Sequence, residues 1–194
     1  MKKLVLVFLL ATFGFSAPLW AAYRSTTITH LAFGSYQLSD GEHSLVGSRV
    51  ALGVKRLYDP HWAWFVTAAD GSAQENFPGP NGSIYTLTAA TTTFTGGYEY
   101  RFALDDRGDI EPFLGFGVNV ISYALDYTYP GSSVGKTSGT GVGPVGELGG
   151  RFAFGDSFTV IPAFQYTAIQ VTTESGSKKA LVSSGLYLGL VFSF

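Results

Sequence analysis

The sequence predicts an all-β fold, a membrane-spanning antiparallel up-and-down β-barrel of eight strands. The first observation behind this prediction is the C-terminal alternation, which places every second residue from Leu186 to Phe194 on one apolar face. The second is an N-terminal export signal. The third is composition, since only 13% of the residues are charged and the mean hydropathy is nevertheless positive. A barrel reconciles these properties because it exposes apolar side chains to lipid at alternate positions.

The first 22 residues have the pattern of a signal peptide. Lys2 and Lys3 precede an apolar run from Leu4 to Phe15, and small residues follow at Ala21 and Ala22. The run is shorter than the ~20 residues that a membrane-spanning helix needs, which disfavours an uncleaved anchor. We therefore expect a signal peptide over residues 1–22 and a single transmembrane β-barrel domain over residues 23–194.

Turn residues divide the remaining chain into eight strand-like segments, over residues 26–39, 44–58, 61–70, 83–103, 110–128, 142–154, 157–172 and 180–194. The connections between them alternate in length. Those at 58–61, 104–109 and 154–157 are short, whereas those at 71–82, 129–141 and 173–179 are longer and rich in small polar residues. Short periplasmic turns opposite longer outer loops are typical of outer-membrane barrels. The connection at 40–43 is short where a long one is expected.

Most segments have one apolar face that is almost free of charge. The clearest are the even-numbered positions of 110–120 and of 158–166. Aromatic residues collect beside the short turns, as expected of a girdle at the membrane interface. They include Tyr58, Trp62, Trp64, Tyr100, Phe102, Phe152, Phe154, Phe158 and Phe194. We expect these faces to contact lipid.

The opposite face carries the charges. Seven of them, four basic and three acidic, are assigned to the barrel interior: Arg49, Lys55, Glu99, Arg101, Glu111, Glu147 and Arg151. Eight strands enclose a space just wide enough for side chains. The charges therefore either pair into a network that plugs the lumen or line a narrow, gated ion path. We expect the paired network, because an unpaired buried charge is costly.

The chain ends in Gly189-Leu190-Val191-Phe192-Ser193-Phe194, with two aromatic residues spaced by one. The segments 97–102 and 111–117 alternate in the same manner. On these residues the chain resembles the small eight-stranded outer-membrane barrels of the OmpA/OmpX type. The resemblance implies that Gly189, Phe192 and Phe194 form a signal for the outer-membrane assembly machinery. It also implies outer-membrane lipids and lipopolysaccharide as partners, and leaves any surface ligand open.

Composition excludes several other classes of protein. The chain has no cysteine, so disulfides and thiol chemistry are unavailable. Without Lys2 and Lys3 the chain has 10 basic and 14 acidic residues, a balance that argues against a nucleic-acid partner. We expect no cofactor and no metal, and we interpret the acidic group at Asp105, Asp106, Asp109 and Glu111 as a solvated turn.

An enzyme that modifies lipid A is the alternative to test. His43, Asp70 and Ser72 resemble the His/Asp/Ser set of the lipid A palmitoyltransferase barrel, except that Gly71 separates the last two. The His-x-Ser triplet of lipid A deacylase barrels does not occur. We therefore expect no catalytic residues.

The function expected from the sequence is that of a non-enzymatic outer-membrane barrel with a plugged lumen and a structural or surface-interaction role. Two alternatives stay open: a narrow pore for ions or small hydrophobic solutes, and a lipid A-modifying enzyme.

Overall fold

The computed structural model describes residues 27–79, 82–102, 104, 109–129, 132–155, 158–173 and 176–192. The expected signal peptide over residues 1–22 and the terminal Phe194 lie outside the described residues, as does the side chain of Phe192. No helix long and apolar enough to cross a membrane occurs within these described ranges.

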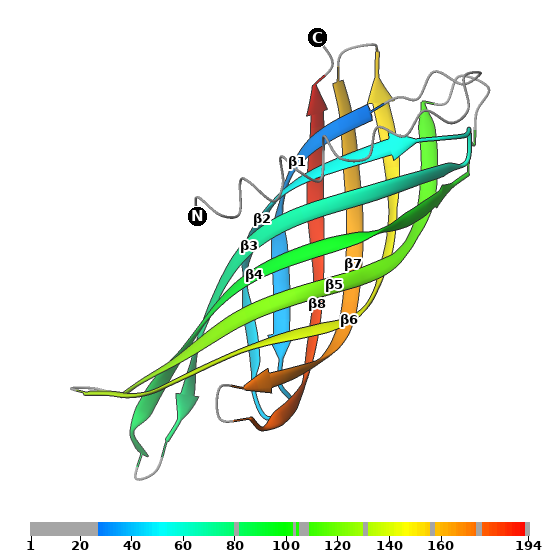
Figure 1. Ribbon diagram of the computed structural model, residues 1–194. Coiled ribbons are helices and arrows are strands. Elements are labelled where there is room, and N and C mark those ends of the chain that lie inside the picture. The colour runs from blue at the N-terminus through cyan, green and yellow to red at the C-terminus, as the bar shows by residue number, and fades with distance from the viewer. Residues whose placement is uncertain are drawn as a thin grey trace.

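Eight antiparallel strands close into one barrel, in which each strand pairs with its neighbours in the chain and β1 also pairs with β8 (Figure 1). The strands are β1 (Thr27–Ser39), β2 (Ser44–Leu57), β3 (Trp62–Pro78), β4 (Ile84–Arg101), β5 (Ile110–Tyr129), β6 (Ser132–Phe154), β7 (Phe158–Thr173) and β8 (Lys178–Phe192). The prediction of an eight-stranded up-and-down barrel is confirmed.

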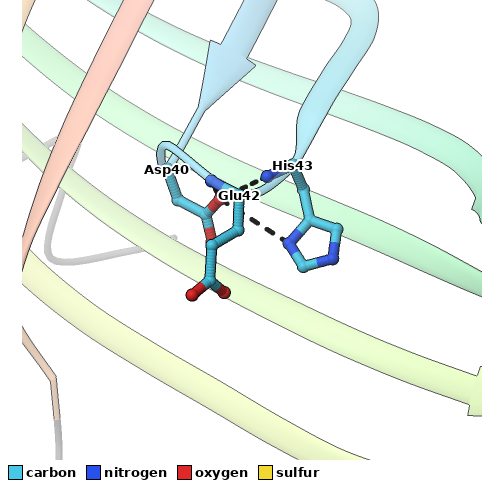
Figure 2. A group of neighbouring side chains, drawn as sticks. All are labelled: Asp40, Glu42 and His43. Atoms are coloured by element: carbon cyan, nitrogen blue, oxygen red, sulfur yellow. Dashed lines mark hydrogen bonds and ion pairs between the residues drawn. The ribbon is translucent and has the colours of Figure 1, made fainter.

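Aspartate side chains close two of the tight turns. Between β2 and β3, Asp59 Oδ1 accepts the backbone N–H groups of His61 and Trp62 at 2.7 and 2.8 Å. Between β1 and β2, Asp40 Oδ1 accepts those of Glu42 and His43 at 3.1 and 2.8 Å (Figure 2). Gly41 in the second turn has a φ of 90°, a conformation that glycine adopts at little cost. Short-range polar sequence therefore fixes these reversals.

Two stretches expected to be loops are strand instead. β3 continues to Pro78, where residues 71–82 are expected to be a loop, and β6 already begins at Ser132 rather than at 142. The extensions pair across their hairpins, from Gln74 opposite Thr88 to Lys136 opposite Asp126. Backbone groups can pair in this way whatever their side chains, so a polar or glycine-rich composition did not reveal these strands.

An apolar belt surrounds the outside of the barrel towards the short turns. On β5, Leu114, Phe116 and Val118 expose 53, 51 and 52% of their surface. Comparable side chains on the other strands include Leu31, Phe33, Val50, Leu52, Val142, Leu148, Phe164, Leu186 and Leu188. Trp62 and Tyr100 pack edge to face at the end of this belt, with ring centroids 5.0 Å apart. Such a continuous apolar exterior is the surface of a membrane-spanning barrel.

Beyond this belt, towards the long hairpins, the pattern reverses. Apolar side chains now point inward and form one buried cluster drawn from seven strands: Tyr36, Leu38, Leu45, Ala73, Leu87, Ala89, Ile121, Tyr123, Leu125, Ile169, Val171 and Leu181. Most outward positions at this level are polar and exposed, among them Ser35, Gln37, Ser48, Ser72, Ser122, Thr140 and Gln170, whereas Val46 is apolar and 57% exposed. This part of the barrel is therefore built like a soluble protein, with an apolar core and a polar surface.

Candidate functional site in the barrel lumen

The charged residues assigned to the interior enter the lumen from four strands. Arg49 and Lys55 lie on β2, Glu99 and Arg101 on β4, Glu111 on β5, and Glu147 and Arg151 on β6. Most of them alternate with outward apolar residues, such as Leu148 on β6, which follows Glu147 and is 58% exposed. The period of two along a strand is what turns these side chains inward.

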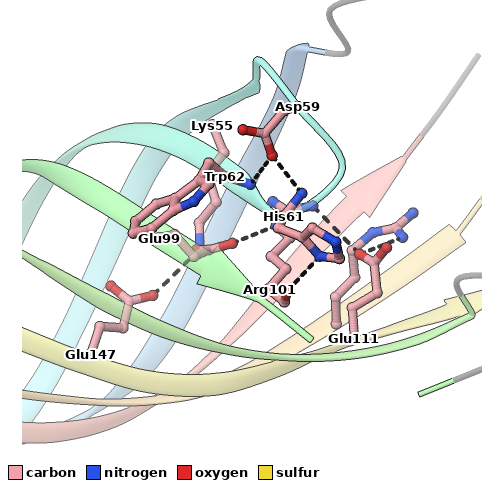
Figure 3. A network of polar contacts seen from close by, with 9 residues as sticks. Lys55, Asp59, His61, Trp62, Glu99, Arg101, Glu111 and Glu147 are labelled. Carbon is pink, nitrogen blue, oxygen red and sulfur yellow. Dashed lines mark hydrogen bonds and ion pairs between the residues drawn. The ribbon is translucent and has the colours of Figure 1, made fainter. Parts of the chain in front are cut away.

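Six of the seven charges form one continuous chain of ion pairs, shown in part in Figure 3. Lys55 Nζ contacts Glu99 Oε2, and it lies 3.4 Å from Glu147 Oε1. Arg101 Nε donates to Glu99 Oε1 at 2.7 Å. Glu111 Oε2 continues the chain, 3.5 Å from an Arg101 nitrogen and 3.1 Å from a nitrogen of Arg151, which ends it. Cations and anions therefore alternate across the lumen from β6 through β2, β4 and β5 and back to β6.

Aromatic rings surround the centre of this chain. Lys55 Nζ lies 4.2 Å from the ring centroid of Phe113 and 5.8 Å from that of Phe65. Both phenylalanines are 1% exposed, and Glu99 is equally buried. The rings fill the space beside the ion pairs and exclude water from them, which strengthens the electrostatic attraction within the pairs.

Arg49 is not part of the chain. Its guanidinium donates to two neutral oxygen atoms instead, Gln165 Oε1 and Thr93 Oγ1, both at 2.7 Å. These residues belong to a polar layer between the ion pairs and the apolar cluster. The same layer holds the hydrogen bond from Thr95 Oγ1 to Asn119 Oδ1 at 3.2 Å.

A small cavity of about 20 Å³ lies in the polar layer. Its lining includes His30, Arg49, Thr67, Glu147, Gln165 and Tyr187. Gly53 makes room for the His30 ring, because a Cβ atom at that position would lie 2.2 Å from His30 Cε1. Two of these lining residues have a buried nitrogen without a hydrogen-bond partner, His30 Nδ1 and Arg49 Nε.

The apolar cluster fills the lumen at a second level. A cavity of about 10 Å³ is found beside Leu38, Leu87 and Leu125, which is too small for a solute. β6 has glycine at the inward positions here, and a Cβ atom on Gly141 would lie 2.6 Å from Ile169 Cγ2. The missing side chains of β6 therefore make room for the cluster.

Sequence reasoning did not anticipate this cluster, although the sequence carries a signal for it. In β5 the apolar residues occupy even-numbered positions up to Val120 and odd-numbered positions after it. In β7 the same change occurs between Tyr166 and Ile169. A phase change without a bulge transfers the apolar face from the outside of the barrel to the inside. Gln165 was also missed as a cavity-lining residue, because an isolated polar residue gives no periodic signal.

Asp40, Glu42 and His43 form a group at the mouth of the barrel, with potential ligand atoms within 4.8 Å of one another (Figure 2). Burial alone raises the pKa of the Asp40 carboxyl, but the N–H groups of His43 and Glu42 outweigh this effect and hold the pKa below its usual value. Lys179 Nζ approaches Asp40 Oδ2 at 3.8 Å. His43 Nε2 hydrogen-bonds to the Tyr85 hydroxyl at 2.9 Å. The arrangement is that of an aspartate that closes a turn.

The residues compared with lipid A-modifying enzymes do not meet. Asp70 and Ser72 lie on the outward face of β3, where Asp70 Oδ1 accepts the Thr92 hydroxyl at 2.7 Å. The His43 ring instead packs against Phe77, with centroids 4.9 Å apart. Phe77 is seven residues further along β3 than Asp70, or about 23 Å at the rise of a strand.

The structure describes only part of the acidic group that the sequence predicts to be a solvated turn. Asp105 and Asp106 lie outside the described residues. Glu111 is engaged by Arg101 and Arg151 in the ion-pair chain.

Comparisons with known proteins agree on the fold. No family model and no curated protein matches the sequence. The crystal structure of Neisserial surface protein A is similar over 89% of this chain and 100% of its own, with a TM-score of 0.57 and 15% identity. Ail, the attachment invasion locus protein of Yersinia pestis, was crystallised with the heparin analogue sucrose octasulfate. It is similar over 89% and 100% of the two chains, with a TM-score of 0.55 and 11% identity.

The outer membrane protein OprG from Pseudomonas aeruginosa is similar over 86% of this chain and 91% of its own, with a TM-score of 0.56 and 13% identity. All three are small eight-stranded outer-membrane β-barrels. The type of barrel that the sequence resembles is thereby confirmed.

Proposed function

We propose that this protein is a non-enzymatic, integral outer-membrane barrel with a closed lumen, and that its role is structural or lies in surface interaction. The observation that carries the proposal is the filling of the lumen at two successive levels. Ion pairs and aromatic rings fill the first, around Lys55 and Glu99. The buried apolar cluster fills the second. Both levels would have to rearrange before a solute could pass.

The outward surface supports the proposed location. The apolar belt suits a lipid environment, and the polar exterior beyond it suits water or lipopolysaccharide headgroups. The hairpins β3–β4 and β5–β6 extend furthest past the belt (Figure 1). Because they are paired strands rather than loose loops, they offer a rigid surface to a partner outside the cell.

Export and assembly complete the proposal. Residues 1–22 direct export and are then removed, and Gly189, Phe192 and Phe194 guide insertion by the outer-membrane assembly machinery. Mass spectrometry of the purified membrane protein tests the first statement, since the expected mass lacks Lys2 and Lys3. A mass that retains both residues contradicts it.

The closed lumen is tested by conductance. The refolded barrel is inserted into planar lipid bilayers, and its insertion is verified by resistance of the β-barrel to protease. We expect no steady single-channel current. A steady current from verified, inserted protein would contradict the closed lumen and favour the narrow pore.

A further inference from the structure

The charges of the lumen do not balance. The six-residue chain contains three cations and three anions and is neutral as a unit. Arg49 adds one positive charge. Within the described ranges, no carboxylate lies at ion-pair distance from Arg49, whose guanidinium contacts only the neutral Gln165 and Thr93 in the hydrogen bonds given above. A cation held in the lumen without a counter-charge is unfavourable.

The cavity beside Arg49 provides both space and donors. Its volume of about 20 Å³ accommodates one water molecule or one ion of similar size. Arg49 Nε–H is buried and has no acceptor. His30 is 5% exposed and its Nδ1 is equally without a partner. This nitrogen is a donor in one of the two neutral tautomers of histidine.

Gln165 adds a third donor. A guanidinium only donates hydrogen bonds, so the atom of Gln165 that faces Arg49 is its carbonyl oxygen. The amide N–H groups of Gln165 are then left for another acceptor. The residues around the cavity therefore supply a cation in excess of the lumen carboxylates and N–H groups without acceptors, which is the environment that an anion requires.

Glu147 also lines the cavity, and its charge is already compensated. Lys55 Nζ lies 3.4 Å from one of its oxygens, and the Tyr187 hydroxyl hydrogen-bonds to it. Its carboxylate also attracts Arg49, but it is shared with Lys55, so the seven lumen charges keep a surplus of one positive charge.

We propose that this cavity is a binding site for one small monovalent anion, chloride under ordinary conditions, held by Arg49 Nε–H together with the N–H groups of His30 and Gln165. The size of the cavity restricts the occupant to a monatomic ion. A water molecule would satisfy the same donors but would leave the positive charge in place.

Urea unfolding of the full barrel in lipid vesicles tests the proposal. Sodium chloride is exchanged for sodium gluconate at constant ionic strength, because gluconate is too large for the cavity. Binding of chloride to the folded barrel is expected to multiply the folding equilibrium constant by one plus the chloride concentration divided by the dissociation constant of the site. The equilibrium constant rises about eleven-fold when chloride is about ten times the dissociation constant. Equal stability in the two salts would show that the cavity holds water only and would overturn the proposal.

Two variants identify the site. Arg49→Gln removes the cation and is expected to abolish the chloride dependence. Lys136→Gln removes one positive charge from the exposed end of β6, and the chloride dependence of this variant is expected to remain. The same chloride dependence in both variants would overturn the proposal.

Bromide provides a second measurement if Arg49→Gln does not fold. Crystals of the unaltered protein grown in bromide are expected to show an anomalous peak within hydrogen-bond distance of Arg49 Nε. No peak in the cavity would overturn the proposal.

Discussion

Glu99 is the residue whose loss should disturb the lumen most. Its two carboxylate oxygens serve two cations, Lys55 and Arg101, and the side chain is 1% exposed. The variant Glu99→Gln keeps the shape of the side chain and removes its charge. Lys55 then retains only Glu147, and Arg101 retains only Glu111 at 3.5 Å. Breaking a buried ion pair by removing one partner costs about 3–5 kcal/mol, and we expect a loss of unfolding free energy in this range.

The assay is urea unfolding of refolded protein in lipid vesicles, followed by tryptophan fluorescence. Glu75→Gln is the matched control, because Glu75 is exposed on the β3 extension. We expect the control to change the unfolding free energy by about 0.5 kcal/mol or less. Equal losses for the two variants would refute the argument that the lumen chain is buried and mutually dependent.

A double variant separates the loss of a charge from the loss of packing. Arg101→Met combined with Glu99→Gln removes one cation and one anion together, and it leaves Lys55 paired with Glu147 and Arg151 paired with Glu111. Replacing a buried pair by uncharged side chains of similar volume is often neutral. The double variant is therefore expected to recover part of the stability that Glu99→Gln loses, and it still reports on the network if the single variant does not refold.

Three further predictions concern other parts of the molecule. Leu114→Arg, in the apolar belt of β5, should lower the unfolding free energy in vesicles by about 2–4 kcal/mol. Ala124→Arg, on the same outward face beyond the belt, should lower it by about 0–1 kcal/mol. Equal losses for the two variants would contradict the placement of the belt. Phe194→Ser should lower the yield of protein in the outer-membrane fraction several-fold, and an unchanged yield would remove the terminal residue from the assembly signal. Asp40 has a folded-state pKa below its unfolded value, so its stabilising effect is complete above the unfolded pKa and is lost as the pH falls through the folded one. Asp40→Asn should therefore show a shallower loss of stability than the unaltered protein between about pH 5 and about pH 2, and parallel curves would contradict this.

The sequence predicted the elements that depend on local alternation. Agreement to two residues or fewer at each end is found at β1, β2, β4, β5 and β7, for which the expected ranges are 26–39, 44–58, 83–103, 110–128 and 157–172. The ends of β3 and β6 were wrong, because pairing at 71–78 and 132–141 depends on the partner strands and not on the composition of the segment itself.

What the sequence by itself determined is which face of each strand a side chain occupies, since that follows from the period of two along an extended backbone. It thereby separated the lipid-facing belt from the seven interior charges. Only the tertiary structure decided which interior residues meet. Lys55 and Glu99 are 44 residues apart and Arg49 and Gln165 are 116 apart, and they come together because barrel closure and strand register set their heights in the lumen. The same register leaves Arg49 outside the neutral chain and beside a cavity, which no pattern along a single strand could indicate.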